Sequence, residues 1–337
     1  MLAFIVRRLA ALLLLMIGIS LITFLMVRMV PGDPAALYYG GAPVSEEVLQ
    51  ALRRQWGLDR PLPVQYLYYL GGLARGNLGV SLTSGRPVLD DLIRRFPATV
   101  ELTVAGVVLA IMAGFPLGVV AALHRNRLSD HALRIVSLVS LGMPNFWLGL
   151  VLIYLFGYLW PVFPPAEGRL ASGIIPPERF TGLYIFDSLL QGNWAALRSA
   201  FLQLLAPAIT VALGLIAVII RMLRAGMLEE LGKDYIRTAR AKGLSARLIF
   251  YKHALRNAVL PTLTVISIQI GYLLGGNVLV EAVFDWPGIG LYYINAVNNL
   301  DYNAVVGTTL LIAVVFTLIN LFVDILNALV DPRIQYG

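Results

Sequence analysis

The chain has 337 residues, of which 58% are hydrophobic and 13% are charged, and its formal net charge is +7 at pH 7. Soluble domains are about 45–50% apolar and about 25% charged, so this composition excludes a water-soluble globule. A mean hydropathy of +0.78 indicates an integral membrane protein whose apolar side chains face lipid. Because cytoplasmic loops of such proteins are rich in basic residues, the positive charge requires no nucleic-acid partner.

Six stretches are long and apolar enough to cross about 30 Å of hydrocarbon as helices of about 20 residues, which predicts an all-α membrane protein. In chain order they are Leu9–Val30, Ala98–Leu123, Leu133–Trp160, Phe201–Ile220, Val259–Val283 and Ala304–Val330. The first resembles a signal peptide, because Arg7 and Arg8 precede it. Its apolar run exceeds the usual length, so we predict a retained signal anchor.

The distribution of basic residues predicts the orientation of these spans. The loop between the fourth and fifth spans, Arg221–Asn257, holds nine Lys or Arg against three acidic residues, and all three lysines of the chain lie in it. By the positive-inside rule this loop is cytoplasmic. An even number of spans then places both termini in the cytoplasm as well.

The region between the first two spans is expected to be a small folded layer on the external side. A turn signal at residues 31–34 precedes two amphipathic stretches, Ser45–Trp56 and Val64–Leu73. We therefore divide the chain into an anchor span (1–30), an external loop with short helices (31–97), a five-span core (98–330) that includes the cytoplasmic loop at 221–257, and a cytoplasmic tail (331–337).

The fifth span is more polar than the others, and polar groups inside a bilayer are costly. Gln269, Asn277 and Glu281 are candidates for lining a substrate path. Two explanations remain open for this surface. Two glycines four residues apart in the same span form a small-xxx-small pair typical of close helix packing, whereas a wet path would use the same side chains.

Catalysis by this chain is not expected. The sequence has no cysteine, which excludes disulfides, thiolate nucleophiles and Cys-ligated metal sites. Its three histidines, His124, His131 and His253, fall outside the spans, which argues against an intramembrane hydrolase or metal centre. Glu101 is expected in the first turn of the second span, where the helix dipole favours an acid.

The cytoplasmic loop contains a segment, 234–245, whose pattern predicts a short helix ending at Gly243. Ile236, Ala239 and Gly243 recur at i, i+3 and i+7. They are expected to form a narrow apolar stripe that another surface can approach closely.

Three cations of the same segment, Arg237, Arg240 and Lys242, would be available to carboxylates of a partner protein. A basic interfacial helix held to anionic lipid explains the same pattern. These residues alone do not separate the two explanations.

Short motifs from end to end of the chain carry a resemblance to a known family. They are Pro31-Gly32-Asp33-Pro34, Gly57-Leu58-Asp59-Arg60-Pro61, Gln65-Tyr66, Gly76-Asn77-Leu78-Gly79-Val80-Ser81, Pro97-Ala98-Thr99-Val100-Glu101-Leu102, Met143-Pro144, the Asp234–Gly243 run, His253-Ala254-Leu255-Arg256-Asn257, and Glu281 with Trp286-Pro287-Gly288-Ile289-Gly290. On these motifs the chain resembles the permeases of binding-protein-dependent ATP-binding cassette (ABC) importers. The match is to the branch that imports dipeptides, oligopeptides, glutathione and nickel.

Two positions depart from the family pattern. Arg237-Thr238-Ala239 replaces the Glu-Ala-Ala of the wider family, as is usual in the peptide branch. Asn303 stands where a proline is common, which affects the local turn.

The resemblance implies a type I importer permease fold with a coupling helix that docks in a groove of a separate ATPase. The coupling residues would be Asp234, Tyr235, Arg237, Thr238, Ala239, Arg240, Ala241, Lys242, Gly243 and Leu244. The implied partners are a second, different permease subunit, two ABC ATPase subunits and an external substrate-binding protein, with membrane lipid around the spans. ATP and Mg would be used by the ATPase subunits and no cofactor by this chain, because Gly232-Lys233 is followed by Asp234 and not by the Ser or Thr of a P-loop.

The function expected from the resemblance is import of dipeptides or short oligopeptides through a bacterial or archaeal inner membrane, without enzymatic activity in this chain. Nickel or glutathione import remains open, because permeases of this branch leave recognition largely to the binding protein. An ATP-independent secondary transporter is a third alternative. It would need a buried, coupled ionisable pair at mid-membrane, which the spans do not indicate.

Overall fold

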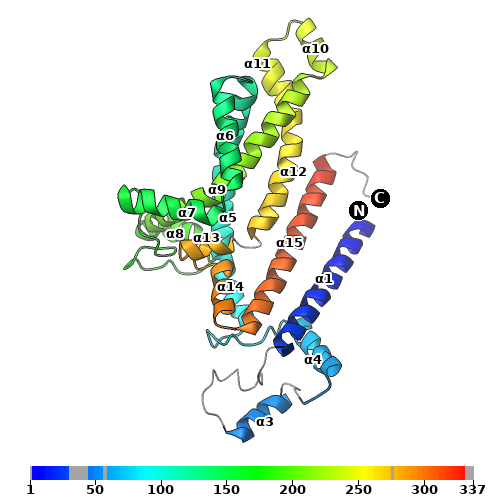
Figure 1. Ribbon diagram of the computed structural model, residues 1–337, viewed down its shortest axis with the longest axis vertical. Helices are drawn as coiled ribbons and strands as arrows, with labels where there is room; N and C mark the ends of the chain where they lie inside the picture. Colours follow the sequence, from blue (N-terminus) through cyan, green and yellow to red (C-terminus); the bar gives the residue numbers. More distant parts are fainter. Residues whose placement is uncertain (1, 30–44, 56–58, 275–276, 331–337) are drawn as a thin grey trace.

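The computed structural model describes residues 2–29, 45–55, 59–274 and 277–330, and every named element in these ranges is helical. The α-helices are α1 (Leu2–Met29), α3 (Glu46–Gln55), α4 (Leu62–Ala74), α5 (Val88–Leu123), α6 (Leu128–Gly142), α7 (Asn145–Leu152), α8 (Tyr184–Gln191), α9 (Trp194–Leu231), α10 (Asp234–Ala241), α11 (Ala246–Leu248), α12 (Leu255–Leu274), α13 (Val278–Val283), α14 (Ile289–Asn298) and α15 (Tyr302–Val330). π-helical turns follow α7 at Ile153–Leu159 and α11 at Ile249–Ala254. Helices α10 and α11 lie at the opposite end of the molecule from α3 and α4 (Figure 1).

Several of these helices could cross a membrane. Within the described residues, four are long and apolar enough: Val88–Leu123, Trp194–Leu231, Ala246–Leu274 and Tyr302–Phe322. A fifth is counted if the bent pair of α6 and α7 with its π-helical turn is one span. The first expected span appears as a shorter apolar stretch, Ala10–Leu25, within α1. The all-helical membrane architecture is confirmed, and the count of six spans stays a prediction.

The third expected span, Leu133–Trp160, is not one straight helix. The chain bends by 106° between Leu128–Gly142 and Asn145–Leu159. Met143 is extended, with φ −99° and ψ 135°, because the ring of Pro144 disfavours helical backbone in the residue before it. The Met143-Pro144 pair therefore makes a corner inside the bundle.

Two further boundaries differ from the sequence prediction. The fifth span does not continue to Val283, because α12 ends at Leu274 and a separate helix, α13, begins at Val278. The second span begins at Val88 instead of Ala98, since α5 continues straight through Pro97. The expected division between the external loop and the core at residues 97 and 98 thus falls inside one helix.

Helix α9 is the centre of the bundle. Of its most apolar window, 72% is buried, compared with 22–33% in the other three long helices. It packs closely against α5 because α5 presents glycines: a Cβ on Gly106 would lie 2.6 Å from Val211 Cγ1, and one on Gly114 would lie 2.9 Å from Ile219 Cβ. The side chains of α9 therefore occupy the space that a larger residue on α5 would need.

Helix α4, part of the layer that the sequence predicts on the external side, packs on the first helix. Both amphipathic stretches are helical, as α3 and α4. The hydroxyl groups of Tyr66 in α4 and Ser20 in α1 lie 2.9 Å apart, and the rings of Tyr66 and Tyr69 pack against Phe24 at centroid distances of 5.3 and 5.8 Å. Tyr66 and Tyr69 of α4 thus pack on α1. The turn expected at residues 31–34 and the tail at 331–337 lie outside the described residues.

Candidate functional site

Helix α10 lies where the sequence predicts a short helix, and it ends as predicted. Gly243 has φ +75°, a left-handed conformation that favours glycine. The Gly243 N–H donates to the Arg240 carbonyl at 2.9 Å, and the Leu244 N–H donates to the Ala239 carbonyl at 3.3 Å. These bonds satisfy carbonyls that the end of the helix would otherwise leave open, so Gly243 is required by the backbone itself.

The apolar stripe of α10 does not form a docking surface, which corrects the sequence prediction. Ile236 is fully buried and Ala239 is 8% exposed. Both belong to a cluster with Met227 of α9 and with Phe250 of the π-helical turn before α12. An eight-residue helix at the end of the bundle is held by burying its apolar side, so this stripe faces the protein's own core, whereas Gly243 stays exposed.

A polar network fixes α10 on its other side. The Glu230 carboxylate at the end of α9 accepts the Tyr235 hydroxyl at 2.6 Å and the Lys233 ammonium at 2.5 Å. The Asn257 side chain of α12 donates to the Tyr235 oxygen at 3.1 Å. Burial and the hydrogen bond to Glu230 raise the pKa of the Tyr235 hydroxyl, so it remains protonated as a donor. Helices α9, α10 and α12 thus meet at one tyrosine.

The outer face of α10 is polar and mainly cationic. Its exposed side chains are Asp234, Tyr235, Arg237, Thr238, Arg240, Ala241 and Lys242. Arg237 pairs with Asp234 at 3.2 Å, but the two side chains are 75% and 92% exposed, so water screens the pair. This face presents three cations and one carboxylate on a helix whose position is fixed by the buried cluster and by the polar network around Tyr235.

Glu281, a candidate for the substrate path, is fully buried at the junction of α13 and α14. Its carboxylate accepts the Thr99 hydroxyl at 2.7 Å and the backbone N–H groups of Gly290 and Leu291 at 2.8 and 3.1 Å. The N–H groups belong to the first turn of α14, where a carboxylate satisfies otherwise open donors. Glu281 therefore holds α14 against α5 in this structure and has no contact with an open surface.

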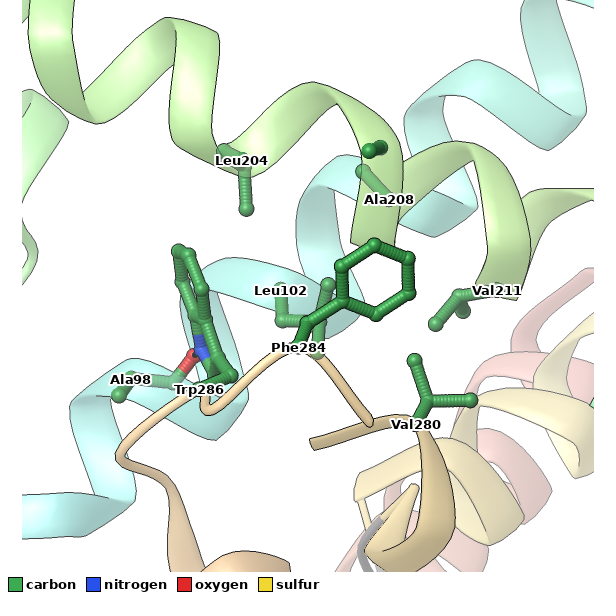
Figure 2. Packing of buried hydrophobic residues seen from close by; sticks show 9 residues of the cluster. Ala98, Leu102, Leu204, Ala208, Val211, Val280, Phe284 and Trp286 are labelled. Atoms are coloured by element: carbon green, nitrogen blue, oxygen red, sulfur yellow. Dashed lines mark hydrogen bonds between the residues drawn. The ribbon is translucent and has the colours of Figure 1, made fainter. Parts of the chain in front are cut away.

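The junction depends on close approach of backbone and side chains. A Cβ on Gly288 would collide with the Glu281 carboxylate and with the Thr99 hydroxyl. Next to it, the Trp286 indole donates to the Ala98 carbonyl at 2.8 Å. Figure 2 shows Trp286 and Phe284 directed from this segment toward α5 and α9, between Leu204, Ala208 and Leu102.

Of the other two path candidates, Asn277 lies one helical turn before Glu281, whose N–H donates to the Asn277 carbonyl at 2.8 Å, whereas Gln269 lies on another helix. Gln269 lies on α12 and lines a cavity of about 160 Å³ at the corner between α6 and α7. Asn277 stands immediately before α13, and its side-chain nitrogen is buried with no hydrogen-bond partner among the described residues. The path assignment of the three residues stays a prediction, with Gln269 alone of the three at that cavity.

Comparison with known sequences assigns the chain to a family. Residues 114–336 match the family described as the binding-protein-dependent transport system inner membrane component, and residues 1–103 match its N-terminal component. The chain belongs to this family of membrane permeases.

Three relatives of this permease are similar over nearly their whole length. It is 42% identical to the probable D,D-dipeptide transport system permease protein DdpB of Escherichia coli (strain K12), over 98% of this chain and 97% of the relative. It is 42% identical to the dipeptide transport system permease protein DppB of the same strain, over 100% and 99%. It is 44% identical to the di/tripeptide transport system permease protein DppB of Pseudomonas aeruginosa (strain UCBPP-PA14), also over 100% and 99%.

Membership of the family fixes the broad role. The chain is a multi-pass inner-membrane component of a binding-protein-dependent transport system, and it is therefore a transporter subunit. The resemblance that the sequence motifs carried is therefore confirmed.

Within the part of the permease that the structure describes, one buried and one partly buried ion pair were not indicated by the sequence. Arg169, in the loop before α8, donates to the Glu101 carboxylate at 2.6 Å. Because α5 begins at Val88, Glu101 lies well inside this helix, and the prediction that it stands in a first turn is wrong. Arg224 of α9 donates to both oxygens of Asp130 in α6, at 2.6 and 2.9 Å. The partners are 68 and 94 residues apart, and no local spacing joins groups that distant.

Proposed function

We propose that this chain is the permease subunit of an ATP-driven importer of dipeptides or short oligopeptides, which an external binding protein delivers. A second, different permease subunit would complete the membrane pathway, and two separate ATPase subunits would bind ATP and Mg. The sequence supports this division of labour, because its one Gly-Lys pair lacks the P-loop context. Both termini and the 221–257 loop would face the cytoplasm, as the basic residues of that loop favour.

The observation that carries the proposal is the construction of α10. Its inner face is locked by Ile236 and by the Tyr235–Glu230 hydrogen bond, so the helix moves together with α9 and α12. Its outer face offers Arg237, Arg240 and Lys242 to an acidic groove on an ATPase. A helix held in this way can transmit a displacement of the ATPase to the spans as a rigid connection. The apolar stripe of α10 is not needed for this docking.

The coupling residues of the proposal are therefore the outward ones. Asp234, Arg237, Thr238, Arg240, Ala241 and Lys242 would contact the ATPase, whereas Tyr235 and Ala239 would position the helix from within the chain. Gly243 and Leu244 would close it. Charge-assisted contacts of this kind combine affinity with a fixed orientation.

The test uses the assembled transporter, co-expressed with its genetic neighbours and reconstituted in vesicles with the binding protein. The double variant Arg237→Glu/Arg240→Glu is expected to keep its membrane insertion and to lose at least ten-fold of the dialanine-stimulated ATPase activity and of uptake. The control Arg54→Glu makes one such charge reversal, half the charge change of the double variant, on the exposed surface of α3 at the opposite end, and is expected to behave as the unsubstituted protein.

Full stimulation in the double variant would contradict docking through α10. Uptake of nickel or glutathione, with none of dialanine, by the unsubstituted complex would instead move the substrate to the other classes of this branch. Uphill transport by this chain alone would make it a secondary transporter.

A further inference from the structure

The cavity at the corner between α6 and α7 gathers polar side chains from three helices. Three of its lining residues have polar side chains, Ser140 at the end of α6, Asn145 at the start of α7 and Gln269 on α12. None of the three makes a hydrogen bond to another described residue. All three residues are half-buried and line the cavity, so a ligand there can supply hydrogen-bond partners that this chain does not.

Several other hydroxyl groups of the spans are satisfied internally. The Ser137 hydroxyl, one turn before Ser140 on the same helix, donates to the Leu133 carbonyl at 2.7 Å. Thr210 and Thr262 bond in the same way to carbonyls of their own helices, at 2.9 and 3.2 Å. Ser140 thus differs from these hydroxyl groups, because it lines the cavity without a bond to its own helix.

The helical backbone is also interrupted at this cavity. The corner at Met143-Pro144 interrupts the helix: the Met143 N–H still donates to the Val139 carbonyl, and the next helix begins from the Pro144 carbonyl, which accepts the Trp147 and Leu148 N–H groups. Irregular backbone at membrane depth is tolerated where it lines a cavity, and broken spans commonly form substrate sites for that reason. On the facing helix α9, Gly214 leaves room for the amide: a Cβ there would lie 3.0 Å from Asn145 Oδ1.

The chemistry of the lining selects among ligands. It contains neutral donors and acceptors, and no charged side chain, histidine or cysteine. Nickel favours imidazole and other charged or strongly donating ligands, which this lining lacks, so the cavity does not suit nickel. A side-chain amide offers a donor and an acceptor, which complement the carbonyl and the N–H of a peptide bond. The volume of about 160 Å³ is several times the ~30 Å³ of a liquid water molecule, which is enough for a peptide group.

We propose that this cavity is a transient binding site on the transport path. Asn145 and Gln269 hydrogen-bond the backbone amide of the peptide as it passes, and Ser140 is a third polar contact. The inference rests on the proposed function, and it adds that the peptide bond is the chemical group of the substrate that this chain recognises. Because the contacts address the peptide bond and carry no charge, the site accepts peptides with different side chains. Gln269 was a path candidate from the sequence, whereas Ser140 and Asn145 were not.

The absence of cysteine from the chain allows a direct test by thiol protection. Asn145→Cys and Gln269→Cys each introduce the sole thiol of this subunit into the assembled transporter. Labelling of the unsubstituted complex measures any modification of thiols on the other subunits. Saturating dialanine, delivered by the binding protein during ATP turnover, is expected to slow modification by a water-soluble methanethiosulfonate at both positions at least three-fold. The control Leu138→Cys, on an exposed position of the opposite side of α6, is expected to show no protection.

A second measurement separates recognition from packing. The double variant Asn145→Leu/Gln269→Met keeps similar side-chain volumes and removes the amides. It is expected to co-purify with its partners and to lower dialanine uptake at least ten-fold, whereas Asn145→Gln, which keeps the amide, should restore most of it. Uptake at the unsubstituted rate in the double variant, or equal thiol modification with and without peptide, would overturn the site and leave the proposed function standing. No dialanine uptake by the unsubstituted complex would overturn both.

Discussion

The guanidinium of Arg169 and the carboxylate of Glu101 form a salt bridge of 2.6 Å in which each side chain is 7% exposed. Arg169 also donates to the Gly182 carbonyl at 2.8 Å and lies 3.6 Å above the ring of Tyr184. Glu101 accepts the Ile185 N–H at 2.8 Å. The pair therefore attaches the loop before α8, and the start of α8, to the interior of α5.

Removing one member of this pair should be far more harmful than removing both. Arg169→Met leaves a buried carboxylate without its counter-charge, and we expect a loss of about 3–5 kcal/mol of stability. The double variant Arg169→Met/Glu101→Gln leaves no buried charge and should recover much of that loss. Thermal unfolding of the detergent-solubilised protein measures both. Equal destabilisation by the single and double variants would show that the charge balance is unimportant.

The junction at Glu281 predicts a steric effect at a single glycine. Gly288→Ala would push a methyl group into the Glu281 carboxylate and the Thr99 hydroxyl, so we expect destabilisation of about 1–3 kcal/mol. Gly71→Ala is the control, because a Cβ on Gly71 in α4 meets no atom within 4 Å and alanine favours a helix. Melting temperatures should fall for the first variant and hold or rise for the second; the reverse order would contradict the packing at the junction.

Asp187 predicts a dependence on pH. Burial alone would raise its pKa, but the Thr181 and Gly182 N–H groups and the Thr181 hydroxyl donate to the carboxylate and hold the pKa below its ordinary value of 3.8. A depressed pKa in the folded state stabilises the fold above the unfolded-state pKa, and this stabilisation is lost as the pH falls through the folded-state pKa.

Asp187→Asn should therefore cost about 1–3 kcal/mol at pH 5–8, with the deficit shrinking as the pH is lowered below about 4. Unfolding midpoints of the two proteins measured across this range give the result. A deficit that is constant to the lowest pH would mean that the carboxylate charge contributes nothing.

Two buried glutamines predict effects of opposite sign. The Gln203 side chain is 6% exposed, its nitrogen has no partner among the described residues, and it lines an apolar cavity of about 240 Å³. Gln65 is 8% exposed, but its nitrogen donates to the Arg60 carbonyl at 2.8 Å. Gln203→Met should raise stability by about 1–2 kcal/mol, whereas Gln65→Met should lower it by a similar amount. A stability loss in Gln203→Met would indicate a satisfied amide at that position.

Sequence reasoning succeeded where a signal is local. Apolar stretches predicted the long helices, the glycine at 243 predicted the end of α10, and amphipathic spacing predicted α3 and α4. It failed where several elements compete for one side chain. The sequence predicted that Ile236 and Ala239 belong to an apolar stripe open to another surface, yet the core beneath α10 buries them.

The sequence by itself determined that this chain is an all-helical membrane protein of the binding-protein-dependent permease family, because hydropathy and contiguous motifs are properties of neighbouring residues. The tertiary structure alone decided which face of α10 is outward, that Glu281 supports α14, and that Ser140, Asn145 and Gln269 share a cavity. Those relationships join residues on different helices. They depend on how the helices pack and bend, which the periodicity within a single helix does not encode.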